Sequence, residues 1–107
     1  MTLAIKWHPD AESEFDADIG WYDGREFGLG DRFEDQALIA VNESADTPEA
    51  WPVWPGWNRQ PVVRSKGVTG FPHRVVYFIE GDLLTIVAIA HTKRRPGYWR
   101  ARVSSPS

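Results

Sequence analysis

The chain has 107 residues, the size of one domain, of which 42% are hydrophobic and 25% charged, as in a folded protein. It contains no cysteine, which excludes disulfides and cysteine-ligated zinc. The net charge of −3 argues by itself against a nucleic-acid-binding protein. However, residues 1–58 carry thirteen acids and three bases, a balance of −10, whereas residues 59–107 carry nine bases and two acids, a balance of +7. This asymmetry predicts either a surface for a polyanion or acidic partner, or two halves that fold against each other.

We expect no membrane anchor in this sequence. Its longest apolar run, residues 83–90, is interrupted by Thr85 and is far shorter than the roughly 20 residues of a spanning helix. Residues 1–7 also lack the basic and apolar regions of a secretion signal. We therefore expect a cytoplasmic protein that does not contact a membrane.

The first part of the chain predicts a short strand followed by a helix. In residues 3–7 the apolar side chains alternate, as they do along a half-buried strand. Pro9 suits the first position of a helix because its missing N–H would have no partner there. Apolar residues then recur at helical spacing: Ala11, Phe15, Ile19 and Tyr22. We expect Gly24 and Gly28 to end this helix.

A second helix is predicted after the turn at residues 27–30. Asp31 suits the N-cap position, and Glu34 three residues later completes a capping box. Apolar residues follow at core spacing: Phe33, Ala37, Leu38, Val41 and Ala45. The helix should end before Pro48, so that the two helices form a hairpin that can pack on a sheet.

Residues 47–61 hold four prolines and three tryptophans. Because proline lacks a backbone donor, this stretch can be neither a helix nor a central strand. We expect an irregular loop whose tryptophans cover the edge of the core. The alternative is a binding surface, since aromatic side chains are favoured at protein interfaces.

The remaining sequence predicts three strands, at residues 62–66, 73–79 and 83–91. A Glu-Gly-Asp turn joins the last two as a hairpin, and the last strand is apolar on both faces, as in a central strand covered from two sides. The order β-α-α-β-β-β predicts an α+β fold: a small, antiparallel-rich sheet with the helical hairpin packed on one face. We expect residues 1–102 to form a single domain and residues 103–107 a flexible tail.

The sequence contains no recognisable metal or nucleophile motif. Its histidines, His8, His73 and His91, are far apart and lack the spacing of metal ligands. No serine or threonine lies in a nucleophile elbow, and the many acids of the first half belong to predicted helix surfaces, where solvation explains them. We therefore expect no metal and no cofactor.

The basic residues of the second half are the remaining candidates for a functional site. Arg64 and Lys66 are two apart on one strand, so they should project from the same face. Further cations and aromatic residues follow: Arg74, Lys93, Arg94, Arg95, Tyr98, Trp99, Arg100 and Arg102. Such a surface can bind single-stranded RNA, and with His91 or Tyr98 as a proton-transfer group it can cleave RNA without a metal. The alternative is that the aromatic residues pack in the core and the cations form a solvated rim.

Several short segments follow one another along residues 3–102. They are Trp7-His-Pro-Asp-Ala11, Trp21-Tyr22, Phe27-Gly-Leu-Gly30, the proline-rich stretch with Arg59, Phe71-Pro-His-Arg-Val-Val-Tyr77, and Ala88-Ile-Ala-His91 running into Arg94-Arg-Pro-Gly-Tyr-Trp99. In their order and spacing, these segments resemble the RelE/ParE superfamily of bacterial toxins. The resemblance implies a growth-inhibiting toxin of a type II toxin–antitoxin system, of the plasmid stabilization kind, that a cognate antitoxin neutralises. It also implies that operator DNA is contacted only through the antitoxin.

The superfamily divides into two kinds of toxin. ParE-like members inhibit DNA gyrase without catalytic residues, whereas RelE-like members are ribosome-dependent endoribonucleases that cut mRNA. The acidic net charge, and Val62-Val63 where a denser lysine pair is expected in a RelE-like chain, favour ParE-like action. RelE-like action is the alternative, and a homologue that has lost its activity is a third hypothesis.

The resemblance assigns different roles to the basic residues in the two cases. For RelE-like action it implies a catalytic set, to which we add His91 for proton transfer: Arg64, Arg74, His91, Lys93, Arg94 and Tyr98. We expect a second set to bind the target or the antitoxin: Lys66, Arg95, Trp99, Arg100 and Arg102.

Overall fold

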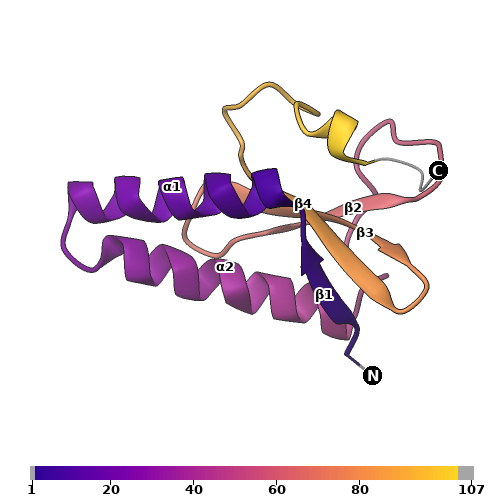
Figure 1. Cartoon of the computed structure of the whole chain (residues 1–107), viewed down its shortest axis with the longest axis horizontal. Coiled ribbons are helices and arrows are strands. Elements are labelled where there is room, and N and C mark those ends of the chain that lie inside the picture. The colour runs from indigo at the N-terminus through magenta and orange to yellow at the C-terminus, as the bar shows by residue number, and fades with distance from the viewer. Residues whose placement is uncertain (1, 104–107) are drawn as a thin grey trace.

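The computed structural model describes residues 2–103, and its elements follow the predicted order (Figure 1). They are β1 (Ala4–Trp7), α1 (Pro9–Arg25), α2 (Leu29–Asp46), β2 (Val63–Gly67), β3 (His73–Glu80), β4 (Leu83–His91) and a short 3-10 turn, η1 (Arg100–Arg102). The strands form one four-stranded sheet in the order β1-β4-β3-β2. β1 runs parallel to β4, and the other two pairings are antiparallel, which confirms the α+β fold with an antiparallel-rich sheet. No helix within residues 2–103 is long and apolar enough to cross a membrane.

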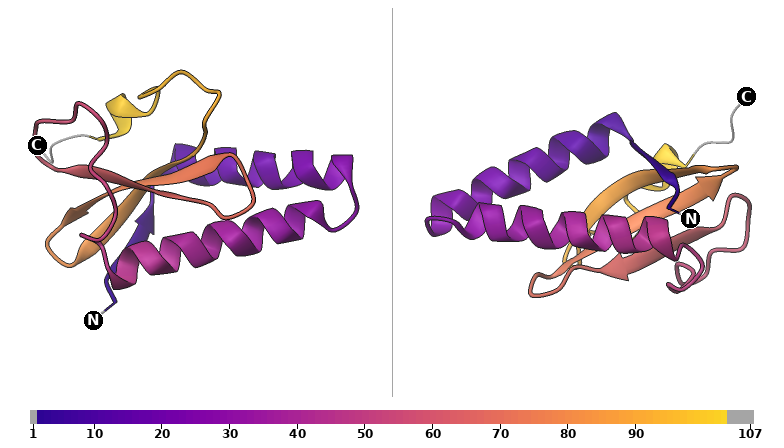
Figure 2. Two further views of the ribbon diagram at one scale, coloured as in Figure 1. Left: turned by 180° about the vertical axis from the view of Figure 1, so that it is seen from behind. Right: turned by 90° about the horizontal axis from the view of Figure 1, so that it is seen from below.

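The two helices lie side by side as an antiparallel hairpin on one face of the sheet (Figure 2). Helix α1 begins with Pro9, as predicted, and the Nδ1 atom of His8 caps it by accepting a hydrogen bond from the backbone N–H of Asp10 at 3.1 Å. Gly24 lies inside this helix, which continues to Arg25. The expectation that Gly24 helps to end α1 is therefore wrong.

Helix α2 begins at Leu29, three residues before the start that Asp31 as N-cap predicts. Its N-cap is Gly28, whose φ of 83° suits glycine and whose missing side chain cannot cap the helix. Asp31 lies within the first turn, so the predicted capping box is wrong. The cap comes from α1 instead, because Asp23 Oδ1 accepts a hydrogen bond from the N–H of Gly30 at 2.8 Å. A cap donated by another helix cannot be found from sequence spacing.

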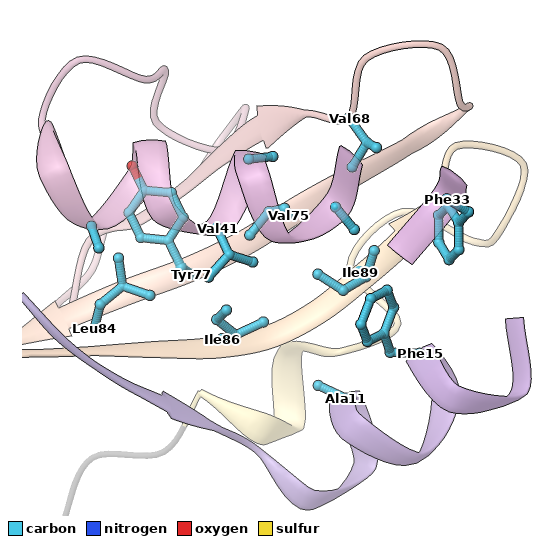
Figure 3. Close-up of a cluster of buried hydrophobic side chains, with 13 residues drawn as sticks. Ala11, Phe15, Phe33, Val41, Val68, Val75, Tyr77, Leu84, Ile86 and Ile89 are labelled. Carbon is cyan, nitrogen blue, oxygen red and sulfur yellow. The ribbon is translucent and has the colours of Figure 1, made fainter. Parts of the chain in front are cut away.

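The helical hairpin and the sheet enclose the larger of two hydrophobic cores (Figure 3). Phe15 of α1 and Phe33 of α2 meet edge-on, with their ring centres 5.6 Å apart, and both are buried. Tyr77 and Ile86 of the sheet are fully buried in the same core. Leu38, expected at a core position of α2, is instead 38% exposed. The periodicity of both helices thus predicts most of their buried side chains, but it misses Ala40 and Ser44, which are also buried.

Irregular segments cover the opposite face of the sheet, on the same side as the C-terminal end of the described chain (Figure 2). We call residues 47–62 the tryptophan loop and residues 92–103 the C-terminal segment. In this second core Trp99 contacts Trp54 edge-on, with 5.0 Å between ring centres, and lies 5.7 Å from Trp57. The tryptophan loop therefore covers the core edge, as expected.

The central strand β4 contributes to both cores. Ile86 is buried in the first core and Val87 in the second, which confirms that this strand is covered from two sides. Val103, the first residue of the expected tail, is only 6% exposed and packs in the second core. The ordered domain therefore includes Val103, while residues 104–107 of the expected tail lie outside the described residues.

Candidate functional site

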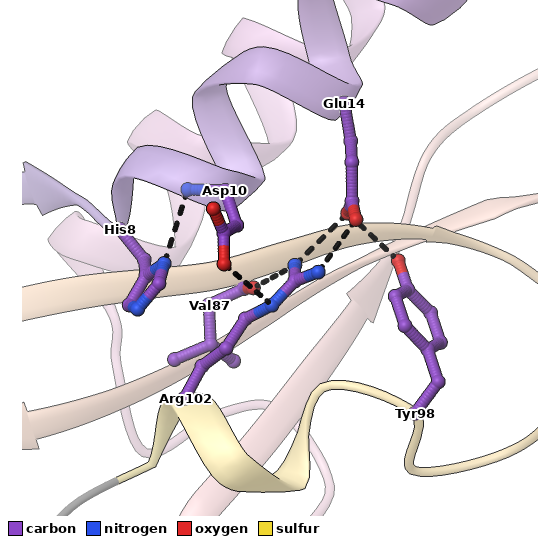
Figure 4. Close-up of polar contacts among 6 residues, drawn as sticks. All are labelled: His8, Asp10, Glu14, Val87, Tyr98 and Arg102. Carbon is purple, nitrogen blue, oxygen red and sulfur yellow. Dashed lines mark hydrogen bonds and ion pairs between the residues drawn. The ribbon is translucent and has the colours of Figure 1, made fainter.

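A polar network, which we call the Glu14 clamp, fastens the C-terminal segment to α1 (Figure 4). Glu14 accepts two hydrogen bonds from Arg102, at 2.5 and 2.9 Å, and a third from the hydroxyl of Tyr98 at 3.2 Å. Arg102 Nη1 also donates to the carbonyl of Val87 at 3.1 Å, and its Nε lies 3.9 Å from Asp10. The side chain of Arg102 is only 14% exposed. Arg102, expected to bind a partner, is therefore engaged inside the domain.

The clamp shifts the pKa of its members. Hydrogen bonding by Arg102 holds the pKa of Glu14 below its usual value, although burial opposes this. Burial, together with the charge of Glu14, raises the pKa of Tyr98 to about 12. At neutral pH the clamp thus consists of a carboxylate, a neutral phenol and a guanidinium.

Two adjoining hollows lie between the C-terminal segment and the tryptophan loop, and we call them together the arginine groove. The smaller, of about 120 Å³, is lined by several of the predicted site residues: Arg74, His91, Arg94, Arg95 and Tyr98. The larger, of about 530 Å³, adds Ser65, Arg100 and apolar residues of the tryptophan loop. The hollows meet at Trp54, Arg74 and Pro96, which line both.

Arg74 stands at the centre of the groove. Its Nε donates to Ser65 Oγ at 2.9 Å, and its Nη2 donates to the carbonyl of Ser65 at 3.1 Å. Ser65 is itself 3% exposed, so the guanidinium is anchored to a buried residue. Arg74 pairs with Gly67 in the sheet register, where a side chain would crowd Nη1 at 3.3 Å.

Arg64 and Lys66 project from the other face of the sheet. Arg64 Nη1 donates to the carbonyl of Trp51 at 2.8 Å, and Lys66 Nζ lies 4.0 Å from the centre of the Trp51 ring and 3.8 Å from Glu43. The prediction that these two cations share a face is confirmed. They do not join Arg74, however, because Arg74 faces the second core. The residues that the RelE-like alternative requires are therefore divided between two faces.

His91 lies at the end of β4, with its ring centre 4.9 Å from that of the buried His73. Its Nδ1 accepts a hydrogen bond from the backbone N–H of Lys93 at 3.0 Å. Burial, followed by the neighbouring His73 and Lys93, lowers the pKa of His91, so the ring is neutral at pH 7. A neutral imidazole that accepts at Nδ1 carries its proton on Nε2. His91 therefore offers a hydrogen-bond donor and no free lone pair. The side chain of Lys93, two residues later, is exposed.

The remaining groove cations rest on aromatic rings or extend into solvent. The guanidinium carbon of Arg94 lies 4.0 Å from the centre of the Tyr98 ring, and that of Arg100 lies 5.5 Å from the Trp57 ring. Trp99 differs from them because it is fully buried. The expectation that Trp99 contacts a partner does not fit this position, and the packing alternative does.

Sequence reasoning missed two important residues, Glu14 and Ser65. Glu14 lies three residues after Ala11 and next to Phe15, so it borders the apolar stripe of α1, a position that distinguishes it from the solvent-facing acids. Ser65 carries no sequence signal, since its role depends on pairing between β2 and β3. Within residues 2–103, no three histidine or acidic side chains come together in a way that could hold a metal ion.

The chain is similar to toxins of toxin–antitoxin systems. The family model described as the ParE toxin of the type II toxin–antitoxin system, parDE, matches residues 5–96. A solved structure of a chromosomal ParDE toxin–antitoxin system from P. aeruginosa shares the fold, with a TM-score of 0.67 and 17% identity over 84% of this chain and 96% of that chain. No curated protein matches. Because the family model spans most of its length, the chain belongs to the ParE toxin family of type II toxin–antitoxin systems.

Proposed function

We propose that this chain is the growth-inhibiting toxin of a toxin–antitoxin pair, and that it acts by binding DNA gyrase and not by cutting RNA. Membership of the ParE family supports the toxin role. The hydrogen bonds and pKa values of the residues that could transfer protons support an action without catalysis.

Cleavage of RNA without a metal requires a group that takes a proton from the 2′-hydroxyl and another that protonates the leaving oxygen. Such groups work best when their pKa lies near the operating pH. Tyr98 has a pKa of about 12, and its hydroxyl donates a hydrogen bond to Glu14, whose own pKa is lowered. The Nδ1 lone pair of His91 is already occupied. The hydrogen bonds that already occupy the Tyr98 hydroxyl and the Nδ1 atom of His91 are the observation that carries the proposal.

The proposal includes a cognate antitoxin that binds this chain and neutralises it. Operator DNA is then contacted through the antitoxin. We expect the pair to act in the cytoplasm, where gyrase works. A short acidic or amphipathic protein encoded beside this gene is the expected antitoxin.

The alternative is a RelE-like, ribosome-dependent endoribonuclease. One observation favours it: Arg74, His91, Arg94 and Tyr98 line a single hollow, where cations can stabilise a phosphate in reaction. In that case Arg74→Ala and Tyr98→Phe should abolish mRNA cleavage.

The two functions are separated by testing the purified chain in two assays. We expect inhibition of DNA supercoiling by purified gyrase, and no new cuts in an mRNA that is being translated in a bacterial extract. Ribosome-dependent cuts that vanish in Arg74→Ala and Tyr98→Phe would overturn the gyrase proposal in favour of the alternative. Unchanged growth of bacteria that express the chain without its neighbour would contradict both active functions.

A further inference from the structure

The arginine groove collects guanidinium groups that the domain does not neutralise. Within residues 2–103, no carboxylate forms an ion pair with the four arginines of the groove: Arg74, Arg94, Arg95 and Arg100. Other cations of the same domain do have acidic partners, as in Arg32 with Glu26 and Arg102 with Glu14. The chain carries more acids than bases, so this lack of partners is a local property of the groove. It indicates an anionic ligand.

The walls between these arginines are apolar. The larger hollow is bounded by three prolines, a valine and a tryptophan: Pro52, Val53, Trp54, Pro55 and Pro96. Trp54 is held edge-on against the buried Trp99, and Val53 remains 40% exposed. A rigid apolar wall beside cations fits a ligand that combines negative charge with a bulky apolar group.

A ligand cannot enter this groove by adding a strand to β2. The tryptophan loop already covers that edge, through a bridge between Val53 and Arg64. The N–H of Trp54 donates to the carbonyl of Val63 at 2.8 Å, and the N–H of Ser65 donates to the carbonyl of Pro52 at 3.1 Å. The side chains of the groove must therefore recognise the ligand, through its charge and through the packing of an apolar group.

Acidic protein fits these features better than nucleic acid does. A third hollow adjoins the groove, shares His91 and Arg94 with it, and is lined by the carboxylate of Asp18. A polynucleotide that continued into this hollow would bring its phosphates towards that carboxylate, and the domain as a whole is negative. A peptide can place its acidic residues over the arginines and an uncharged residue beside Asp18.

We propose that the arginine groove docks an acidic peptide segment with one bulky apolar side chain, presented by the protein that the toxin inhibits. The acidic side chains pair with Arg95 and Arg100 at the rim and with Arg74 at the centre. The apolar side chain packs against Trp54 and Pro96. This inference rests on the proposed function only for the source of the segment, and the chemistry of the ligand follows from the groove.

The ligand class is tested by fluorescence anisotropy with the purified full chain and labelled synthetic probes. The probes are an acidic peptide with one central tryptophan, the same peptide with serine in its place, a neutral tryptophan peptide, and single-stranded oligothymidine. We expect the acidic tryptophan peptide to bind at least about tenfold more tightly than the others, since both charge and anchor contribute. Tighter binding of oligothymidine, or equal binding of all peptides, would overturn the proposal.

The location is tested with a charge-reversed groove, Arg95→Glu with Arg100→Glu. The matched control is Lys6→Glu with Arg25→Glu, which makes the same charge change on two exposed cations outside the groove. We expect the groove variant to bind the acidic tryptophan peptide at least about tenfold more weakly, and the control to bind it within about twofold of the wild type. Both variants must retain the unfolding midpoint of the wild type, because these side chains lie at the surface. Equal binding by the two variants would refute the location.

The source of the segment is tested by adding the acidic tryptophan peptide to a gyrase supercoiling assay. We expect it to relieve inhibition by the toxin, and the groove variant to inhibit weakly. If the peptide displaced the antitoxin from the toxin but did not relieve gyrase inhibition, the groove would belong to the antitoxin and the target assignment would be overturned. If the wild-type chain does not inhibit gyrase at all, the proposed function fails, while the anisotropy results still decide the ligand class.

Discussion

The two faces of the sheet are covered in different ways. On one face, the apolar stripes of helices α1 and α2 pack against the sheet, and many residues each contribute a moderate buried area to the core. On the other, the tryptophan loop and the C-terminal segment have almost no regular structure, and the second core depends on a few large rings around Trp99. The candidate binding surface lies on this second face.

The difference shows how an irregular cover can be both stable and functional. Loops satisfy fewer of their own backbone groups than helices, so they need specific attachments to hold one shape. Here the attachments are a buried tryptophan and the Glu14 clamp, which reaches across from α1. With these in place, the arginines of the segment remain free to meet a partner. The comparison therefore predicts that stability on the second face is concentrated in a few residues.

The largest effect is expected for Trp99→Ala. Removing this fully buried ring should lower the free energy of unfolding by about 3–5 kcal/mol. The control is Trp21→Ala on the helical hairpin, where the ring is 55% exposed, and a change within about 1 kcal/mol is expected. Urea unfolding followed by circular dichroism measures both. Equal losses in the two variants would refute the concentration of stability around Trp99.

The next effect is expected for Glu14→Gln. The variant leaves the largely buried Arg102 without its charged partner and weakens the hydrogen bond from Tyr98, which should cost about 1–3 kcal/mol. Glu12→Gln, on the exposed side of the same helix, should change stability by less than about 0.5 kcal/mol. If the variants were equally stable, Glu14 would be only a surface acid.

The clamp also predicts how stability depends on pH. Because the pKa of Glu14 is lowered in the folded state, its contribution is complete above the unfolded pKa and is lost as the pH falls through the folded pKa. The difference in unfolding free energy between wild type and Glu14→Gln should therefore be constant near neutral pH and shrink as the pH falls below 4.5, the ordinary pKa of a glutamate. Urea unfolding at a series of pH values measures it. A difference that grows in acid would contradict the sign of this shift.

The smallest effect is expected on the helical face, at the cap of α2. Asp23→Ala removes the acceptor of the Gly30 N–H and should cost about 0.5–2 kcal/mol. Asp31→Ala, at the position that sequence spacing favours as the cap, should cost less, because Asp31 makes no capping bond. Thermal unfolding of the two variants compares them. A larger loss for Asp31→Ala would restore the capping box that the spacing predicts.

Sequence alone determined the order of the elements, both helix faces and the central strand. These features depend on the local spacing of apolar residues and on proline, which act wherever the chain is placed. The spacing of Arg64 and Lys66 likewise predicted correctly that they share a face. Local pattern also identified the family, through segments spread along most of the chain.

Only the tertiary structure decided which of the basic residues meet. Side chains alternate between the two faces of a sheet, and in the β2–β3 register Arg74 and Arg64 lie on opposite faces. Arg102 is held inside the domain by Glu14, which is 88 residues away in the chain. Trp99 is similarly removed from the surface because two tryptophans of a distant loop enclose it. Long-range contacts choose among cations and aromatic rings that look equivalent in sequence. For that reason the chemistry of the second face depends on how the C-terminal segment is attached to α1.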